Sequence, residues 1–148
     1  MLKFIYITII YIKTDAYTIK MTDKSTVLKT FNAHFFEFLD DIIRIFPENN
    51  DIATARKSFD TIKRANPTII IKVWGNYVYT PYKEVIDQGN IDFFFDKDYG
   101  SDLGSITNGK EVMRIIDTLR DPLRSMDVVN KQHSAKYLLN LSKLSALY

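Results

Sequence analysis

The sequence has no cysteine, only two histidines and few residues that break helices. Without cysteine the chain forms no disulfide, no thiolate metal site and no thiol nucleophile. Two histidines, His34 and His133, are too few for a multi-histidine metal site. Five glycines and four prolines among 148 residues exclude collagen-like and linker-like chains and predict short loops. No phosphate-binding loop or nucleophile–base spacing is present either, so we expect no catalytic, metal or cofactor site.

The composition is that of a folded protein. Hydrophobic residues make up 46% of the chain and charged residues 26%. A chain of this length can form one domain with a buried core. The net charge of +2 is too close to zero to predict a polyanionic partner by itself. Isoleucine (19) and lysine (14) outnumber leucine (11), and this bias towards codons rich in A and T indicates an AT-rich genome.

Residues 1–20 differ from everything after them. The isoleucine, tyrosine, phenylalanine and threonine of residues 4–12 form a run too short to span a bilayer, and they are typical of a strand. Lys13–Asp15 offers no signal-peptide cleavage site, so we expect a protein that is not secreted and has no membrane span. We interpret residues 1–20 as an N-terminal extension, either a short strand or disordered, upstream of a candidate natural start at Met21. Residues 21–148 then form a single helical domain.

Apolar residues at helical spacing predict two helices after the extension. The first covers residues 22–46, where Thr22 or Ser25 can cap it and Pro47 ends it. The second covers roughly residues 51–65 and carries a single apolar stripe. The linker between them is short enough to make the two helices an antiparallel hairpin.

The next segment, residues 67–79, fits two structures. Its β-branched and aromatic residues around Gly75-Asn76 are typical of a β-hairpin, whereas Asn66-Pro67 is a cap followed by proline at a helix start. Because its neighbours are helical, we favour the helix. A short helix over residues 82–88 follows, and Gly89 closes it.

The C-terminal part predicts two more helices. One covers about residues 110–120, and Asp121-Pro122 provides a cap and a proline that start the last one. The predicted fold class is therefore all-α, a compact bundle of five or six helices. We expect its core to include six apolar residues on the inward faces: Phe35, Leu39, Ile43, Phe59, Ile62 and Ile116.

Several ionisable residues lie along the first predicted helix. Asp40 and Asp41 point about 100° apart on a helix, which favours two exposed carboxylates over an acid–base pair. His34 lies near Glu37 and Asp41 in sequence, but the three form no known catalytic constellation. We therefore expect no enzyme activity.

Four motifs carry a family resemblance: FFEFLDDIIRIFP, ANPTIIIKVW, GNIDFFFDKDY and KYLLNLSKLSALY. Together they resemble a group of short, uncharacterised helical proteins from large nucleocytoplasmic DNA viruses of algae and protists. The resemblance covers roughly residues 22–148 and leaves out residues 1–20. It implies a viral protein of the virion, such as a minor capsid protein, or of the host cytoplasm and the viral factory. It implies no catalytic residue.

The first functional hypothesis is a non-enzymatic structural or interaction protein that binds other viral proteins or itself. Abundant aromatic residues and a seam on the last helix supply more apolar surface than the bundle must hide. Core packing is the alternative interpretation of that seam, and also of Trp74. The candidate partner surface consists of Phe93, Phe94, Phe95, Tyr137, Leu141, Leu144 and Tyr148.

The alternative is a nucleic-acid-associated protein of the viral factory. Residues 22–109 hold ten basic and thirteen acidic residues (net −3), whereas residues 110–148 hold seven basic and four acidic (net +3). Phosphate contacts need such cations on one surface, so a continuous basic stripe would favour this alternative. The candidate contacts are Arg114, Arg120, Arg124, Lys131, Lys136 and Lys143.

Overall fold

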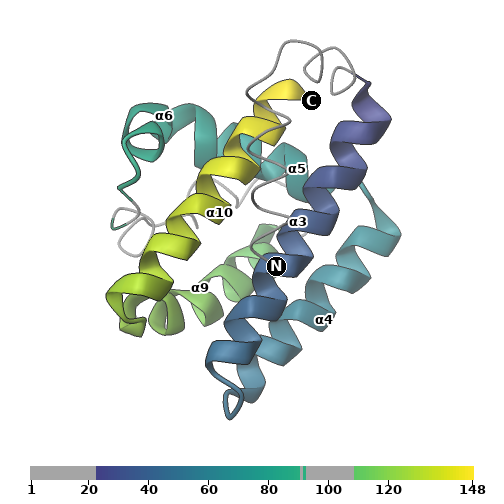
Figure 1. Cartoon of the computed structure of the whole chain (residues 1–148). Coiled ribbons are helices and arrows are strands. Elements are labelled where there is room, and N and C mark those ends of the chain that lie inside the picture. The colour runs from purple at the N-terminus through teal and green to yellow at the C-terminus, as the bar shows by residue number, and fades with distance from the viewer. Residues whose placement is uncertain (1–22, 91, 93–108) are drawn as a thin grey trace.

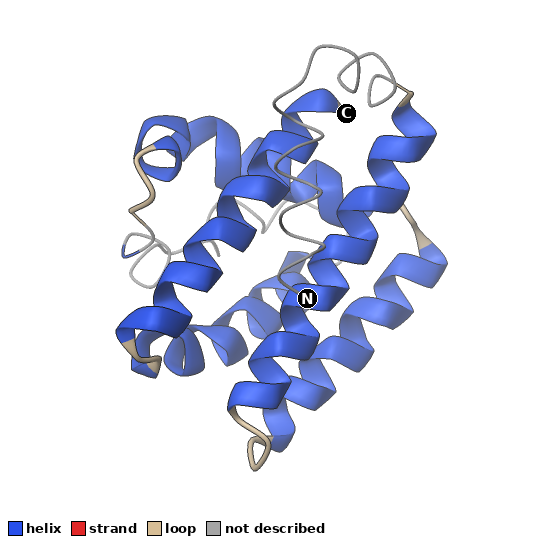
Figure 2. Ribbon diagram, in the orientation of Figure 1, coloured by secondary structure: helices blue, strands red, loops and turns tan. Residues whose placement is uncertain are grey.

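A computed structural model describes residues 23–90, 92 and 109–148 of the chain. Within these ranges every regular element is a helix and none is a strand (Figure 2). Five helical segments follow one another: α3, α4, the continuous run of α5, η1 and α6, then α9 and α10 (Figure 1). The all-α bundle predicted from the sequence is confirmed. The extension, residues 1–20, lies outside the described residues.

Helix α3 (Lys24–Ile45) is the centre of the bundle, with α10 on one side and α4 on another (Figure 1). Its N-cap is Asp23, whose carboxylate accepts hydrogen bonds from the Ser25 amide and the Thr26 hydroxyl. The prediction that Thr22 or Ser25 caps this helix is therefore wrong, because the Asp23 carboxylate already accepts from the Ser25 amide.

Helix α4 (Asn50–Ala65) runs antiparallel to α3 across a short turn (Figure 1), as predicted. The Asn49 side chain caps it by accepting from the Asp51 amide at 3.0 Å. Arg56 of α4 pairs through two guanidinium nitrogens with Asp40 of α3. This bidentate contact joins the exposed edges of the two helices, while their apolar stripes face inward.

The ambiguous segment is helical from Ile69 onwards, whereas Pro67 and Thr68 form a turn, so the helix starts two residues later than Asn66-Pro67 predicted. Helix α5 (Ile69–Val73) continues into the π-helix η1 (Trp74–Tyr79) and then into α6 (Thr80–Asp87). The wider π turn comes directly before Pro81, whose ring has no amide hydrogen to give to the preceding turn. The Gly75 carbonyl accepts from the Thr80 amide in the π turn and also from the Thr80 hydroxyl at 2.6 Å. The helical interpretation of this segment is confirmed, and the π turn is new.

The last two helices are α9 (Gly109–Ser125) and α10 (Val128–Leu147). The prediction that Asp121-Pro122 starts the last helix is wrong, because α9 continues through Pro122. Proline in the final turn removes only one hydrogen bond of the helix, so the chain tolerates it there. The break comes at Asp127, whose carboxylate caps α10 by accepting from the Asn130 amide at 2.8 Å.

The core is rich in aromatic rings from α3. Phe35 packs edge-on against Phe59 of α4, with ring centres 4.9 Å apart, and against Trp74 of η1 at 6.4 Å. Of the six predicted core residues, Phe35, Leu39 and Phe59 are buried, as predicted. Ile43 and Ile62 are partly buried and pack against this core. The side chain of Ile116 lies outside the described set.

We expect Phe35→Ala to lower the free energy of unfolding by about 3–5 kcal/mol, since the ring is buried among other rings. Urea unfolding followed by circular dichroism measures the loss. Val129→Ala is the control at an exposed position and should change stability by less than about 0.5 kcal/mol. A cost below about 1 kcal/mol for Phe35→Ala would show that the ring is not a core anchor.

Candidate functional site

The contact between α3 and α10 buries an ionisable pair. The hydroxyl of Tyr137 on α10 donates a hydrogen bond to Oδ2 of Asp41 on α3, and both side chains are buried. The expectation that Asp40 and Asp41 are both solvated is therefore wrong for Asp41. The angle between adjacent helix positions turns Asp40 towards Arg56 of α4 and Asp41 towards α10.

One cation faces the buried carboxylate. Nη2 of Arg44, one turn further along α3, lies 2.7 Å from Oδ1 of Asp41. The Arg44 side chain is 65% exposed, so its charge is solvated while that of Asp41 is not. Asp41 is thus held by a neutral donor inside the protein and by a water-exposed cation at the surface.

His34 extends the cluster along the same face of α3. Its ring lies 4.8 Å from the ring of Tyr137, and its Nδ1 lies 3.8 Å from the carboxylate of Glu37. Burial lowers the pKa of His34 to about 4, so the ring is neutral at pH 7. Burial and then the nearby charge of Asp41 raise the pKa of Glu37, which Arg44 opposes.

The electrostatics of this cluster favour fixed hydrogen bonds over catalysis. Burial, reinforced by Asp41, raises the pKa of the Tyr137 phenol far above its ordinary value. Tyr137 therefore keeps its proton and acts as a donor to Asp41. His34 is fully buried, so it has no surface on which to meet a substrate. A general base needs both access and a pKa near the working pH, and these groups lack one or the other.

A cavity of about 110 Å³ lies beside the cluster, between α3 and the beginning of α10. Its volume equals that of about three to four water molecules. The lining combines apolar and polar side chains: Phe38, Asp41, Ile42, Arg44, Ile45, Met126, Asn130, His133, Ser134 and Tyr137.

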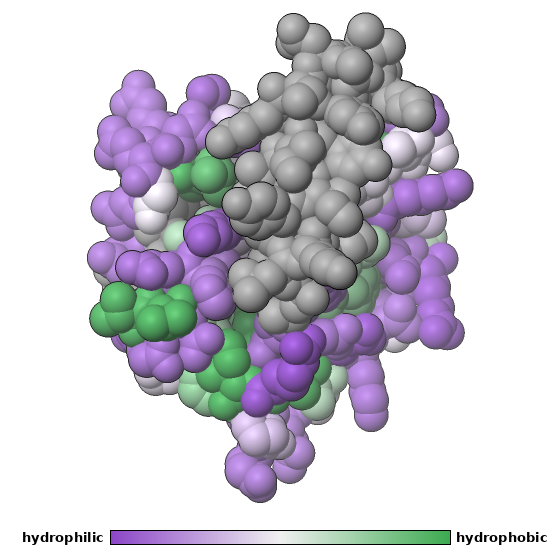
Figure 3. Space-filling model, viewed as in Figure 1, coloured by the Kyte–Doolittle hydropathy of each residue, from purple (hydrophilic) through white to green (hydrophobic). Residues whose placement is uncertain are grey.

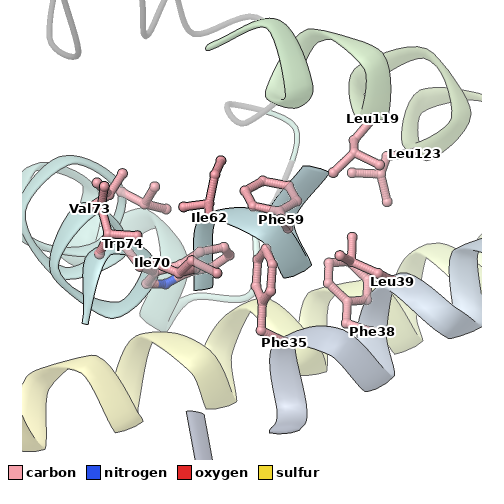
Figure 4. A pocket seen from close by; sticks show the side chains of 12 residues that line it. Phe35, Phe38, Leu39, Phe59, Ile62, Ile70, Val73, Trp74, Leu119 and Leu123 are labelled. Atoms are coloured by element: carbon pink, nitrogen blue, oxygen red, sulfur yellow. The ribbon is translucent and has the colours of Figure 1, made fainter. Parts of the chain in front are cut away.

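A second cavity, about 50 Å³, lies in the core between α3, α4, the α5–η1 run and α9 (Figure 4). Side chains such as Phe35, Phe59 and Leu119 point into it from three different helices. Its lining is almost entirely apolar, and the indole nitrogen of Trp74 donates to Ser142, so little is left to orient a ligand. We interpret it as a gap in core packing.

The predicted partner surface on α10 is corrected by the structure. Tyr137, Leu141 and Leu144 are all buried inside this chain, at 1%, 0% and 0% exposure. The prediction that they face a partner is wrong, because α10 packs along α3 and η1 and uses this seam itself. Tyr148 is partly buried under the ammonium group of Lys24, 5.2 Å from its ring centre. The cluster Phe93–Phe95 lies outside the described residues.

The candidate nucleic-acid contacts lie on more than one face. Lys136 and Lys143 are seven residues apart on α10 and share a side, whereas Lys131 lies about 140° around the helix from Lys136. Arg124 lies on α9 and pairs with Asp121 at 3.2 Å.

The remaining two predicted contacts add little to a stripe. Arg120 is half-buried, and the side chain of Arg114 is outside the described set. The described cations therefore do not form the continuous stripe that would favour nucleic acid.

Two features of this region were missed from the sequence. His34, Phe38 and Asp41 follow one another at spacings of four and three, so they share one helix face, and this signal was available. Val128 and Val129 are exposed at the start of α10, and nothing in their spacing distinguishes them from core residues.

Comparison of the chain with protein-family models, curated proteins and solved structures finds no match. The viral resemblance and the role that it implies therefore stay sequence-based predictions. Among the described helices, none is both long enough and apolar enough to cross a bilayer.

We expect Tyr137→Phe to cost about 1–3 kcal/mol, because it leaves the buried Asp41 carboxylate without its inner donor. Asp41→Asn should also destabilise the protein, and the double variant should cost less than the sum of the two. A double-mutant cycle in urea at pH 7 measures this coupling, expected at about 0.5–3 kcal/mol. Losses that simply add would show that the two groups do not interact.

We also expect the protein to lose stability between about pH 6.5 and pH 4. The unfolded His34 takes up a proton near pH 6.5, whereas the folded ring does so only near its pKa of about 4. The unfolded state therefore binds more protons as the pH falls, which costs about 2 kcal/mol at pH 5. Glu37 acts in the opposite direction, because its raised pKa means that the folded state takes up this proton before the unfolded state does. It therefore offsets part of the loss of stability at the acidic end of the range.

The comparison of urea unfolding at pH 7.5 and pH 5 tests this expectation. His34→Gln cannot take up the proton, so its stability should change less between the two pH values than that of the parent. His133→Gln is the matched control at a partly exposed position and should keep the parent response. Equal pH responses of the parent and His34→Gln would contradict the assignment to His34.

Proposed function

We propose that this chain is a non-enzymatic protein that acts through contacts with other proteins, in the virion or capsid-associated role that the resemblance implies. One observation carries the proposal. Val128 and Val129, adjacent at the start of α10, are 71% and 60% exposed. Figure 3 shows a hydrophobic patch at the left edge of the molecule, on the side where α10 begins in Figure 1, with hydrophilic surface around it.

The position of the two valines makes a structural explanation weak. The first turn of a helix favours small polar or acidic residues, and Asp127 already supplies the cap that α10 needs. Valine is a poor helix former and contributes nothing to a core from an exposed position. Burial of a valine side chain is worth about 1.5–3 kcal/mol, so a partner that covers the pair gains stability that the monomer does not use.

The surroundings of the pair have the composition of an interface rim. Asp121 and Arg124 lie at the end of α9 and form an ion pair at 3.2 Å with both side chains exposed. At the start of α10, the backbone and side-chain amides of Asn130 donate hydrogen bonds to the Asp127 carboxylate. An apolar centre within a polar rim is the ordinary arrangement of a protein–protein contact. The ionisable cluster at α3 and α10 supports a non-enzymatic role, because its groups are engaged in holding helices together.

We expect the double variant Val128→Asp/Val129→Asp to lose the protein's association while its helicity and unfolding midpoint stay close to those of the parent. The reason is that both side chains are exposed, so the change removes apolar contact area and leaves the core intact. Sedimentation velocity measures self-association. Affinity capture with the parent and the variant as bait measures binding of other proteins.

Thr54→Asp/Thr61→Asp is the matched control, since it adds the same charge at exposed positions of α4. Association should survive in this control. Identical oligomeric states and identical captured proteins for parent and valine variant would refute the proposal. Tight binding to DNA that falls steeply as salt is raised would instead favour the nucleic-acid alternative.

A further inference from the structure

The lining of the cavity between α3 and α10 includes a buried charged group. Asp41 is the most deeply buried charged group in its lining, at 7% exposure. Oδ2 of Asp41 accepts from Tyr137, which is itself buried. Oδ1 lies 2.7 Å from Arg44, but in an orientation that forms no hydrogen bond. One oxygen of a buried carboxylate is thus held by an ion pair alone.

The negative charge of Asp41 favours a cation as the ligand of this cavity. A buried carboxylate repels an anion strongly, because little water screens it. Burial and then the charge of Asp41 raise the pKa of Glu37, so this neighbouring carboxyl group senses the negative charge of Asp41. Arg44, the opposing cation, has a side chain that is 65% exposed, so it can leave Asp41 for water without losing its own hydration. A second cation can therefore replace Arg44 at Oδ1 with little loss.

The apolar residues of the lining favour a ligand that also has an apolar part. Phe38, Ile42, Ile45 and Met126 supply apolar surface to the same lining as the carboxylate. A cationic head on a short apolar stem satisfies both parts of such a cavity. Arginine and lysine side chains have this form.

The position of the cavity connects it with the exposed valines. His133 of the cavity lining is one helical turn from Val129, so both lie on the same side of α10. We propose that the cavity receives an arginine or lysine side chain of the partner protein, which displaces Arg44 from Asp41 while the partner covers Val128 and Val129. This inference rests on the proposed function, and it names the chemistry of the partner at that site.

The cavity can be tested without the partner, using n-propylguanidinium as the probe. A titration followed by amide chemical shifts should show saturable binding, with changes concentrated at residues 41–45 and 130–137. n-Propylurea has the same shape without the charge and should not saturate. Arg44→Ala removes the competing cation and should tighten probe binding by up to about fivefold. Asp41→Asn should abolish it.

Arg44→Ala keeps the test decisive even if Asp41→Asn folds poorly, since the Arg44 side chain is exposed. No saturable binding of the probe to either the parent or Arg44→Ala would overturn the inference. Equal binding of the uncharged analogue, or weaker binding in Arg44→Ala, would also overturn it. These outcomes are separate from those of the valine variant. Failure of the valine test alone would refute the proposed function and leave a cation-binding cavity without a partner.

Discussion

The packing of α10 against α3 is the contact on which the rest of the described structure depends. Helix α3 also carries α4 and the α5–η1 run, so it is covered on several sides. A helix in that position must bury whatever residues its sequence places there, polar ones included. Asp41 and His34 are buried for this reason, and each needs compensation inside the protein. Asp41 obtains it from Tyr137, and His34 obtains it by remaining neutral.

Helical periodicity was sufficient to predict the fold class and most of the elements. The stripe of α4, the hairpin of α3 with α4, and the helical state of residues 69–79 all follow from spacing and neighbours. Local sequence signals predicted the wrong helix boundary where two candidate caps lie close together. Asp121-Pro122 has the composition of a helix start, yet three more residues of α9 follow Pro122 before the chain breaks at Asp127. The sequence contains both caps, and tertiary packing decides which one is used.

The candidate site was harder to predict, because burial on several sides removes the signal that marks a surface. Helix α10 contacts α3 on one side and η1 on another, where Trp74 donates to the Ser142 hydroxyl at 2.9 Å. Its buried face therefore includes Asn140 and Ser142 beside Leu141 and Leu144. An apolar seam beside polar residues resembles an exposed interface in the sequence, while in the fold both are interior. Val128 and Val129 are residues of a type common in cores, so only the structure shows that they are exposed.

Two of the buried polar contacts of α10 fix its position in a way that apolar packing does less well. Buried charges rarely increase stability over well-packed apolar residues, so stability alone does not account for Asp41. A hydrogen bond is directional, whereas leucine and phenylalanine contacts tolerate a shift along the helix axis. Tyr137 fixes α10 against α3, and five residues later Ser142 fixes it against η1. With both positions fixed, α10 has a set register and its first turn has a set place. The exposed valines and the mouth of the cavity are then preorganised, which lowers the entropy that a partner must give up on binding.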